Sequence, residues 1–215
     1  MTVTNTRPGD RHPESQRRLG HGQLLERPFP TVTAAFYHHA IVCPDATAVR
    51  DLSGSPRELT YAELAGRAQS LAAQLRAQGV VPNSRIPLVV KRGLDMIVGI
   101  WAILSCGAQY IPLDGGVVPD ETIRRILEQS NSGVVLCLSS TKHRITTQHP
   151  DQTVIVIDEA NTTSFESNQG DYVDLSTPDG GCYVIYTSGK LRDAYLHRLS
   201  LTRSQEPQDS RKESM

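Results

Sequence analysis

Residues 86–157 alternate between short apolar runs and longer stretches with helical spacing, and this alternation limits the fold more than any other feature. The apolar runs span 86–90, 109–113, 134–138 and 153–157, and helical stretches occupy 94–105 and 120–130. Strands that are apolar at nearly every position are typical of a parallel sheet, because crossover helices cover both of its faces. A further buried strand is predicted at 182–186, after a polar loop over 158–181. We therefore expect an α/β fold with a mostly parallel sheet and helices on both faces.

The N-terminal half contains a helix with clear start and end signals. Thr60 and Glu63 have the spacing of a capping box, in which each side chain accepts a hydrogen bond from the other residue's backbone N–H. Gly79 stands where a left-handed residue commonly ends a helix. The apolar residues between these signals fall on one helical face: Leu64, Ala68, Leu71, Ala72 and Leu75. Upstream, we expect a helix over 34–42 and a β-hairpin with its turn at 53–56.

Composition divides the chain into three parts. Residues 1–28 are rich in Arg, Pro, Gly and Ser and lack apolar periodicity, so we expect a disordered leader or linker. Residues 29–189 hold the periodic elements and are predicted to form one α/β unit. Residues 190–215 become polar and charged after one or two helical turns. We expect this last part to be an unrelated, disordered tail that adds no strand or helix to the sheet.

Charge and cysteine usage exclude several classes of protein. Lys and Arg number 22 against 23 Asp and Glu, which gives a net charge of −1 and no overall attraction to nucleic acid. The longest apolar run, 96–104, is far shorter than the roughly 20 residues that cross a bilayer, and the N-terminus has no apolar signal core. The four cysteines lie far apart without metal-ligand spacing, so neither a disulfide framework nor a metal site is predicted. We expect a cytoplasmic protein with reduced thiols and no membrane or nucleic-acid partner.

One local constellation suggests a ligand site. The strand predicted over 182–186 runs directly into Thr187, Ser188 and Gly189. Hydroxyl groups and a glycine after a buried parallel strand lie where phosphate-binding loops form, since the carboxyl ends of the strands open into the ligand crevice. An ordinary turn remains the alternative, because Thr-Ser-Gly on its own is common turn sequence.

Three segments, in order, resemble the first core motifs of adenylate-forming enzymes, most closely the adenylation domains of fungal nonribosomal peptide synthetases. Residues 59–64 (LTYAEL) look like the first motif of that family, and residues 104–114 (LSCGAQYIPLD) look like the second. Residues 186–189 (YTSG) look like the opening of the third motif, which is the phosphate loop, and residues 44–49 are similar to the usual entry into the domain. The resemblance covers about residues 30–189 and identifies the chain as the first part of the family's large α/β domain.

The resemblance implies ATP and Mg²⁺ as cofactors and a small carboxylic or amino acid as substrate. Enzymes of this family activate an amino or aryl acid as an acyl-adenylate, here in secondary-metabolite biosynthesis. Thr187, Ser188 and Gly189 are the cofactor-binding residues that it implies. It assigns no catalytic residue and no metal ligand to this chain, because the family's residues for acid, ribose, magnesium and catalysis follow the phosphate loop.

Residues 190–194 (KLRDA) bear no likeness to the family's continuation of that loop, so we expect a truncated domain that is inactive alone. We hypothesise that a frameshift or a misplaced splice junction at Gly189 and Lys190 explains the change. A non-catalytic interaction protein and an unproductive gene remnant remain the alternatives. Sequence from the genome or the transcript downstream of residue 189 decides between them.

The remaining candidates favour structural roles. His38 and His39 have no Asp, Glu or Cys at ligand spacing, and Lys190 is more typical of a solvated lysine than of a phosphate ligand. Asp158–Glu159 follows a strand, where a carboxylate could meet a ligand, but the pattern favours a loop N-cap or a solvated pair. Helical spacing predicts that Trp101 lies in the core, and that Arg124–Arg125 forms salt bridges with Glu121 and Glu128.

Overall fold

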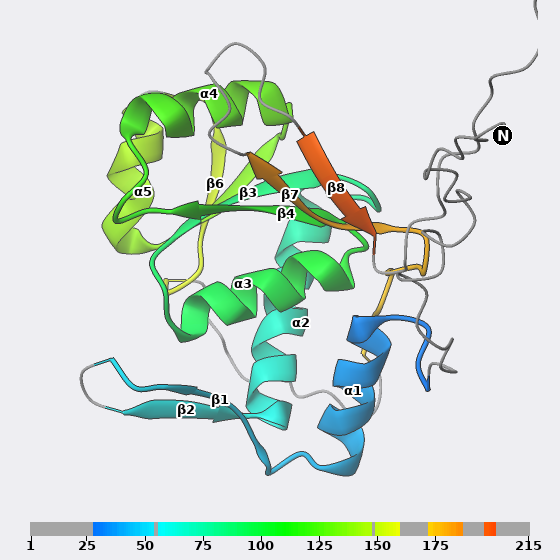
Figure 1. Cartoon of the computed structure of the whole chain (residues 1–215). Coiled ribbons are helices and arrows are strands. Elements are labelled where there is room, and N and C mark those ends of the chain that lie inside the picture. The colour runs from blue at the N-terminus through cyan, green and yellow to red at the C-terminus, as the bar shows by residue number, and fades with distance from the viewer. Residues whose placement is uncertain (1–27, 54–55, 148, 160–171, 187–195, 201–215) are drawn as a thin grey trace, which may run out of the picture.

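The computed structural model describes residues 28–53, 56–147, 149–159, 172–186 and 196–200. Its six-stranded sheet has the order β6-β5-β3-β4-β7-β8, and a separate hairpin joins β1 to β2 (Figure 1). The elements, in chain order, are α1 (Val32–Val42), β1 (Thr47–Asp51), β2 (Arg57–Thr60), α2 (Tyr61–Ala77), β3 (Arg85–Val90), α3 (Leu94–Ser105), β4 (Gln109–Asp114), α4 (Asp120–Ser130), β5 (Val134–Cys137), α5 (Ser139–Thr146), β6 (Thr153–Val156), β7 (Gly181–Tyr186) and β8 (Leu196–Ser200).

Local sequence signals set the ends of the helices. The Thr60 hydroxyl accepts from the Glu63 N–H at 3.2 Å, and the Glu63 carboxylate accepts from the Thr60 N–H at 2.8 Å, so α2 begins with the predicted capping box. Gly79 ends that helix region with a φ of +83°, a backbone conformation that glycine adopts at little cost. α1 begins at Thr31, whose hydroxyl accepts from the Ala34 N–H.

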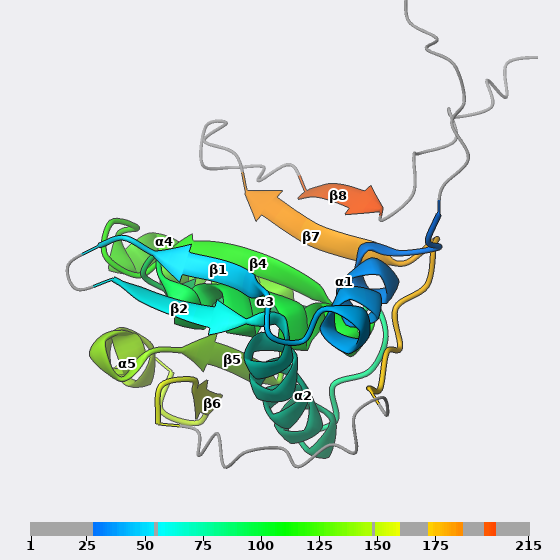
Figure 2. The ribbon, with the colours of Figure 1, turned by 90° about the horizontal axis from the view of Figure 1, so that it is seen from below.

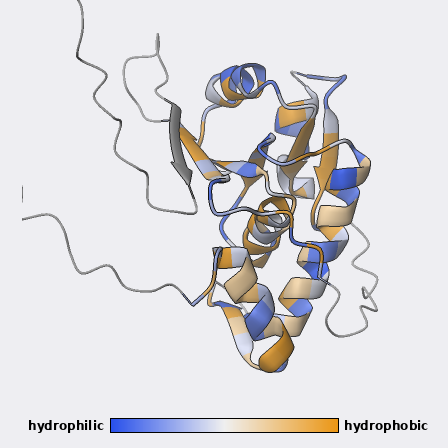
Figure 3. Ribbon diagram, turned by 90° about the vertical axis from the view of Figure 1, so that its right-hand side faces the viewer, coloured by the Kyte–Doolittle hydropathy of each residue, from blue (hydrophilic) through white to orange (hydrophobic). Residues whose placement is uncertain are grey.

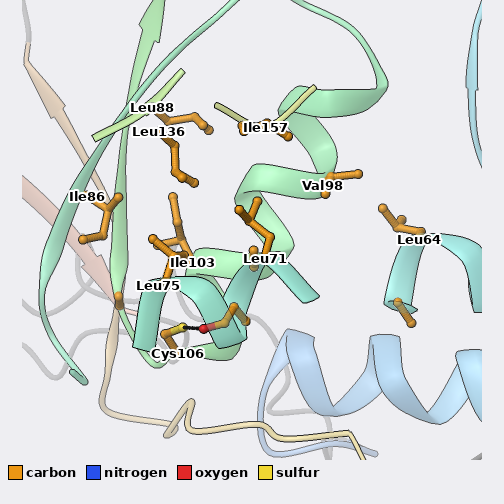
Figure 4. Packing of buried hydrophobic residues seen from close by; sticks show 14 of the residues in the cluster. Leu64, Leu71, Leu75, Ile86, Leu88, Val98, Ile103, Cys106, Leu136 and Ile157 are labelled. Carbon is orange, nitrogen blue, oxygen red and sulfur yellow. Dashed lines mark hydrogen bonds between the residues drawn. The ribbon is translucent and has the colours of Figure 1, made fainter. Parts of the chain in front are cut away.

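The strands from β6 to β7 are parallel, and along each strand successive side chains point to opposite faces of the sheet. Ile86, Leu88 and Leu136 point to the first face, where they pack against α2 and α3 (Figure 4). Trp101 of α3 stacks on Phe36 of α1, with ring centroids 4.1 Å apart, so the three helices share this cluster.

The opposite face is covered by α4 and α5. Val89, Ile111 and Val135 point to it and form a second apolar cluster with residues of the two helices, including Ile123 and Ile145. Hydrophobic residues are concentrated in the strands, and the helices carry both hydrophobic and hydrophilic residues (Figure 3). The prediction of a mostly parallel sheet with helices on both faces is therefore confirmed.

Two elements were not predicted from the sequence. Helix α5 occupies residues expected to form a short polar segment, and β8 pairs antiparallel with β7 although no strand was expected beyond residue 189. Figure 2 shows β7 and β8 on one side of the sheet and β6 on the other, so β8 and β6 are its two outer strands. The expectation that residues 190–215 add no strand is thus wrong at residues 196–200.

Candidate functional site

The carboxyl ends of the parallel strands meet along one edge of the sheet, which is the usual place for ligands in open α/β sheets. Lys91 and Arg92 follow β3, Gly115 and Gly116 follow β4, and Ser139 follows β5. Asp158 stands two residues after the end of β6. β7 ends on the same edge at Tyr186, so the chain leaves this edge immediately before Thr187, Ser188 and Gly189. Those three predicted site residues lie outside the described residues.

The loop after β4 packs closely against its neighbours. The Gly115 N–H donates to the Val90 carbonyl at 2.9 Å. A Cβ on Gly115 would lie 2.5 Å from Cγ2 of Thr141, which is closer than side chains approach. Thr141 is fully buried, and its hydroxyl donates to the Val89 carbonyl at 2.7 Å. The ends of β3 and β4 and the first turn of α5 therefore form one close-packed unit that requires glycine at position 115.

Arg144 of α5 fixes the rest of this loop. Its guanidinium donates to the Gly115 carbonyl at 2.6 Å and to the Val118 carbonyl at 2.5 Å. It also donates from Nε to the Asp120 carboxylate at 2.6 Å, at the first residue of α4. Charge-assisted hydrogen bonds of this kind are stronger than neutral ones. One side chain thus joins the loop after β4 to both helices of the second face.

Asp158 serves α5 instead of standing free for a ligand. Its carboxylate accepts from the Ser139 N–H at 2.8 Å and from the Ser139 hydroxyl at 2.6 Å. Partial burial opposes ionisation, but these bonds outweigh it and lower the pKa of Asp158 below its ordinary value. These bonds make Asp158 a cap for the first turn of α5, whereas the sequence had allowed a ligand contact, a loop N-cap or a solvated pair.

The described part of the edge carries two exposed cationic side chains. Gly116 lies beside Lys91, because a Cβ built on Gly116 would be 3.8 Å from Cε of that lysine. Arg92 is the next residue in the chain, and both side chains are exposed. A nucleophilic thiol is not available here, since burial raises the pKa of Cys137 at the end of β5 to about 12. The edge therefore offers positive charge, which suits an anionic ligand, while the N–H groups of Gly115, Gly116 and Ser139 are bonded within the chain.

A buried polar network holds the segment that leads into β7. The amide of Gln69 donates to the Val173 carbonyl at 2.9 Å and accepts from the Val173 N–H at 3.2 Å. The same amide donates to the Tyr37 hydroxyl at 2.5 Å, which also bonds to Ser105. Burial raises the pKa of Tyr37 to about 12, so the phenol stays neutral. The network ties helices α1, α2 and α3 to the chain just ahead of β7.

The structure describes several of the weaker sequence candidates. Arg124 pairs with Glu121 and Glu128, as predicted. His38 and His39 are exposed, and the described residues contain no group of three or more His, Cys, Asp or Glu side chains that could hold a metal ion. Lys190 lies outside the described residues.

Sequence reasoning missed some residues that shape this edge. Arg144 and Thr141 belong to a helix that was not predicted, and Gln69 lies on a helix whose apolar face alone was identified. Lys91 and Arg92 carried a usable signal, because they directly follow a predicted strand.

The cysteines agree with the expectation of free thiols, with Cys106 and Cys137 buried and Cys43 exposed. No helix in the described part of the chain is long and apolar enough to cross a membrane.

Comparison with known proteins identifies the protein family of this chain. The family model described as "AMP-binding enzyme" matches residues 36–189. An adenylate-forming reductase of the fungus Coprinopsis cinerea is 38% identical over 173 residues, covering 80% of this chain and 16% of the reductase. Tyrocidine synthase 3 of Brevibacillus parabrevis is 34% identical over 179 residues, covering 82% of this chain and 3% of the synthase.

Solved structures agree with these matches. The nonribosomal peptide synthetase FmoA3 in its AMPPNP-bound form has a TM-score of 0.65 and 30% identity, over 75% of this chain and 16% of that one. A fatty acyl-adenylate ligase of L. pneumophila, solved with acyl adenylate and pyrophosphate, shares the fold with a TM-score of 0.67 at 20% identity, over 80% of this chain and 31% of the ligase.

The fold and these matches thus define an α/β domain of the adenylate-forming class. More narrowly, the chain belongs to the AMP-binding enzyme family and is homologous to the adenylation domains of nonribosomal peptide synthetases. It spans about one sixth of the length of the adenylate-forming reductases that it matches.

Proposed function

We propose that this chain carries the N-terminal part of an adenylation domain whose loop after β7 binds the phosphates of ATP. The observation that carries the proposal is the position of β7. This strand ends at Tyr186 on the carboxyl edge of a parallel sheet, and Thr187, Ser188 and Gly189 come next in the sequence. The family match ends at residue 189, and the synthetase FmoA3 was solved with the ATP analogue AMPPNP.

The chemistry of such a domain is a substitution at the α-phosphorus of ATP. The carboxylate of an amino or aryl acid forms the new bond to phosphorus, and the bond to pyrophosphate breaks. In this proposal the backbone N–H groups and hydroxyls of residues 187–189 hold the phosphates. Among the described residues, no group of three or more His, Cys, Asp or Glu side chains could hold a metal ion, and Asp158 is bonded to Ser139. The proposal therefore assigns magnesium none of the described residues.

We further propose that the 215-residue chain does not catalyse adenylation by itself. Residues 190–194 do not resemble the family's phosphate loop beyond its first residues, and the resemblance places the groups that bind the acid and the ribose later in the sequence. The same proposal gives the protein a cytoplasmic location and a role in secondary-metabolite synthesis. The experiment is ATP–pyrophosphate exchange with a panel of amino and aryl acids, in which we expect no exchange. Clear exchange by the purified chain would overturn this part.

Phosphate binding is tested separately from catalysis. Titration with ATP, and then with pyrophosphate, should shift the amide NMR signals of residues 187–189 at weak, millimolar affinity. The variant carrying Thr187→Ala and Ser188→Ala should lose most of these shifts. The matched control carries Thr163→Ala and Ser164→Ala, the same substitutions at another Thr-Ser pair, and should bind like the wild type. Equal shifts in both variants would show that the loop is not the phosphate site.

A further inference from the structure

The outer edge of β7 is covered by a strand from the C-terminal part of the same chain. β7 pairs parallel with β4 on its inner side and antiparallel with β8 on its outer side (Figure 1). Five residue pairs join β7 to β8, with Val184 opposite Arg198 at the centre of the register. In the described part of the chain this is the one antiparallel pairing of the six-stranded sheet. The backbone groups that β7 turns away from β4 therefore find their partners in β8.

The sequence of β7 makes a free edge hazardous. Residues 181–186 (GCYVIY) include aromatic and β-branched side chains and hold neither a charge nor a proline. Segments of this length and composition readily add a strand from another chain when their edge is exposed. Val184 is fully buried in the second apolar cluster, so β7 cannot leave the sheet without opening that cluster. The edge of β7 therefore has to be covered where it lies.

The opposite edge of the sheet is protected by its own sequence. β6 has only four residues, Pro150 and Asp151 precede it, and Asp158 follows it. Short edge strands, and prolines and charges near an edge, all hinder the addition of another strand. β7 has six residues and none of these features, so the two edges of the sheet differ in how they are protected.

β8 has the properties of a protecting strand and lies outside the region shared with the family. It is five residues long and its sequence includes His197 and Arg198. Charged residues in an outer strand disfavour further pairing. The match to the family model ends at residue 189, before β8 begins. This strand therefore comes from the tail of this chain and not from the matched domain.

We propose that β8 is an edge-protecting strand. Residues 196–200 occupy the outer edge of β7 in place of a strand from a second copy of the chain, and this pairing keeps the chain from associating through β7. The proposal does not rest on phosphate binding, because it concerns the backbone pairing of residues 181–186 with residues 196–200 and none of residues 187–189.

Two adjacent prolines in the full chain test this pairing. The N–H groups of neighbouring strand residues point to opposite sides, so the variant with His197→Pro and Arg198→Pro loses a bond to β7 whichever residue donates it. Hydrogen exchange at the amides of β7 should become faster by about tenfold or more. Sedimentation velocity should show association of the variant at concentrations where the wild type is monomeric, and the oligomers should bind thioflavin T. The matched control carries Gln208→Pro and Asp209→Pro, beyond β8, and should behave like the wild type.

A charge placed on β7 separates edge pairing from other causes of association. Ile185→Lys, at a residue 41% exposed, adds like charges to two edges that would pair. In the proline variant it should therefore restore the monomer without restoring β8. Val173→Lys adds the same charge at a residue 42% exposed outside the strands, and it should leave the association unchanged.

The other outcomes would each overturn the proposal. Faster exchange in β7 without association would show that this edge needs no cover, and unchanged exchange would show that β8 does not cover it. Loss of the helical circular dichroism signal in the proline variant would assign β8 a role in folding itself. Restoration of the monomer by Val173→Lys as well as by Ile185→Lys would trace the association to net charge. A wild type that associates as readily as the proline variant would show that β8 gives no protection.

Discussion

The two faces of the sheet are held to their helices by different kinds of contact. On the first face, α1, α2 and α3 share one continuous apolar cluster, and its polar groups form the closed network of Tyr37, Gln69 and Ser105. On the second face a smaller apolar cluster is joined by charged groups at the rim, chiefly Arg144 and Asp158. The first face therefore depends on burial, whereas the second depends in part on charges that water and salt can reach.

A matched pair of core residues allows the stability of the two faces to be compared. Ile86 and Ile111 are each 1% exposed, lie on neighbouring strands, and point to the first and second face respectively. Replacing either with Ala should cost about 2–5 kcal/mol of unfolding free energy, because a buried cavity remains. Urea denaturation followed by circular dichroism measures both. If Ile111→Ala lowers the unfolding free energy by much less than Ile86→Ala does, the second apolar cluster is not packed as tightly as the structure shows.

The next largest effect is expected in the polar network of the first face. Gln69→Leu keeps the volume of the 1%-exposed side chain but leaves the Val173 backbone groups without partners and removes one of the two hydrogen bonds of the Tyr37 hydroxyl. We expect a loss of about 1–3 kcal/mol, the usual cost of buried unsatisfied polar groups. The loss should be the same at low and high salt, because the network carries no charge. Tyr37→Phe in the Gln69→Leu background should not recover the loss, because the Tyr37 hydroxyl keeps its hydrogen bond to Ser105.

Arg144 provides the corresponding test on the second face. Arg144→Met removes the bonds to Gly115, Val118 and Asp120, and we expect a loss of about 1.5 kcal/mol, since Asp120 is exposed to solvent. Unlike the loss for Gln69→Leu, this one should shrink as salt is added. Hydrogen exchange at residues 115–118 should also become faster. A loss that salt does not change would remove the distinction between the faces.

The same contrast explains what the sequence could predict. Apolar periodicity and local caps fix α2, α3 and α4, because the signals for these elements lie within the elements themselves. Helix α5 was missed because its residues are mostly polar and the carboxylate that caps it, Asp158, lies 19 residues after Ser139. Gln69 was missed for a similar reason, since the backbone it binds at Val173 is 104 residues away. Contacts between distant segments leave no local pattern.

The strand before the predicted phosphate loop could be recognised from its own residues, whereas the role of the loop could not. The position of β7 could be predicted, because Cys182, Tyr183, Val184 and Ile185 form a short apolar run bounded by glycine and hydroxyl residues. Family resemblance, and not residue spacing, gave residues 187–189 their predicted role. That role stays a prediction, since these residues lie outside the described part of the structure.

The smallest effect is expected at Asp158, where the charge at the second face can be titrated. The folded-state pKa of Asp158 is lowered by its bonds to Ser139, so its contribution to stability is present above the unfolded-state pKa, near 4. That contribution is lost as the pH falls through the folded-state pKa, because protonation then occurs in both states. Asp158→Asn should cost about 0.5–1 kcal/mol at neutral pH, a value that solvent exposure keeps small. The difference between wild type and variant should shrink between neutral pH and an acid pH below the folded-state pKa of Asp158. Urea midpoints at the two pH values measure it, and Asp151→Asn, at an exposed carboxylate outside the cap, should show no such pH-dependent difference. A difference that persists in acid would mean that Asp158 stabilises α5 by packing and not through its charge.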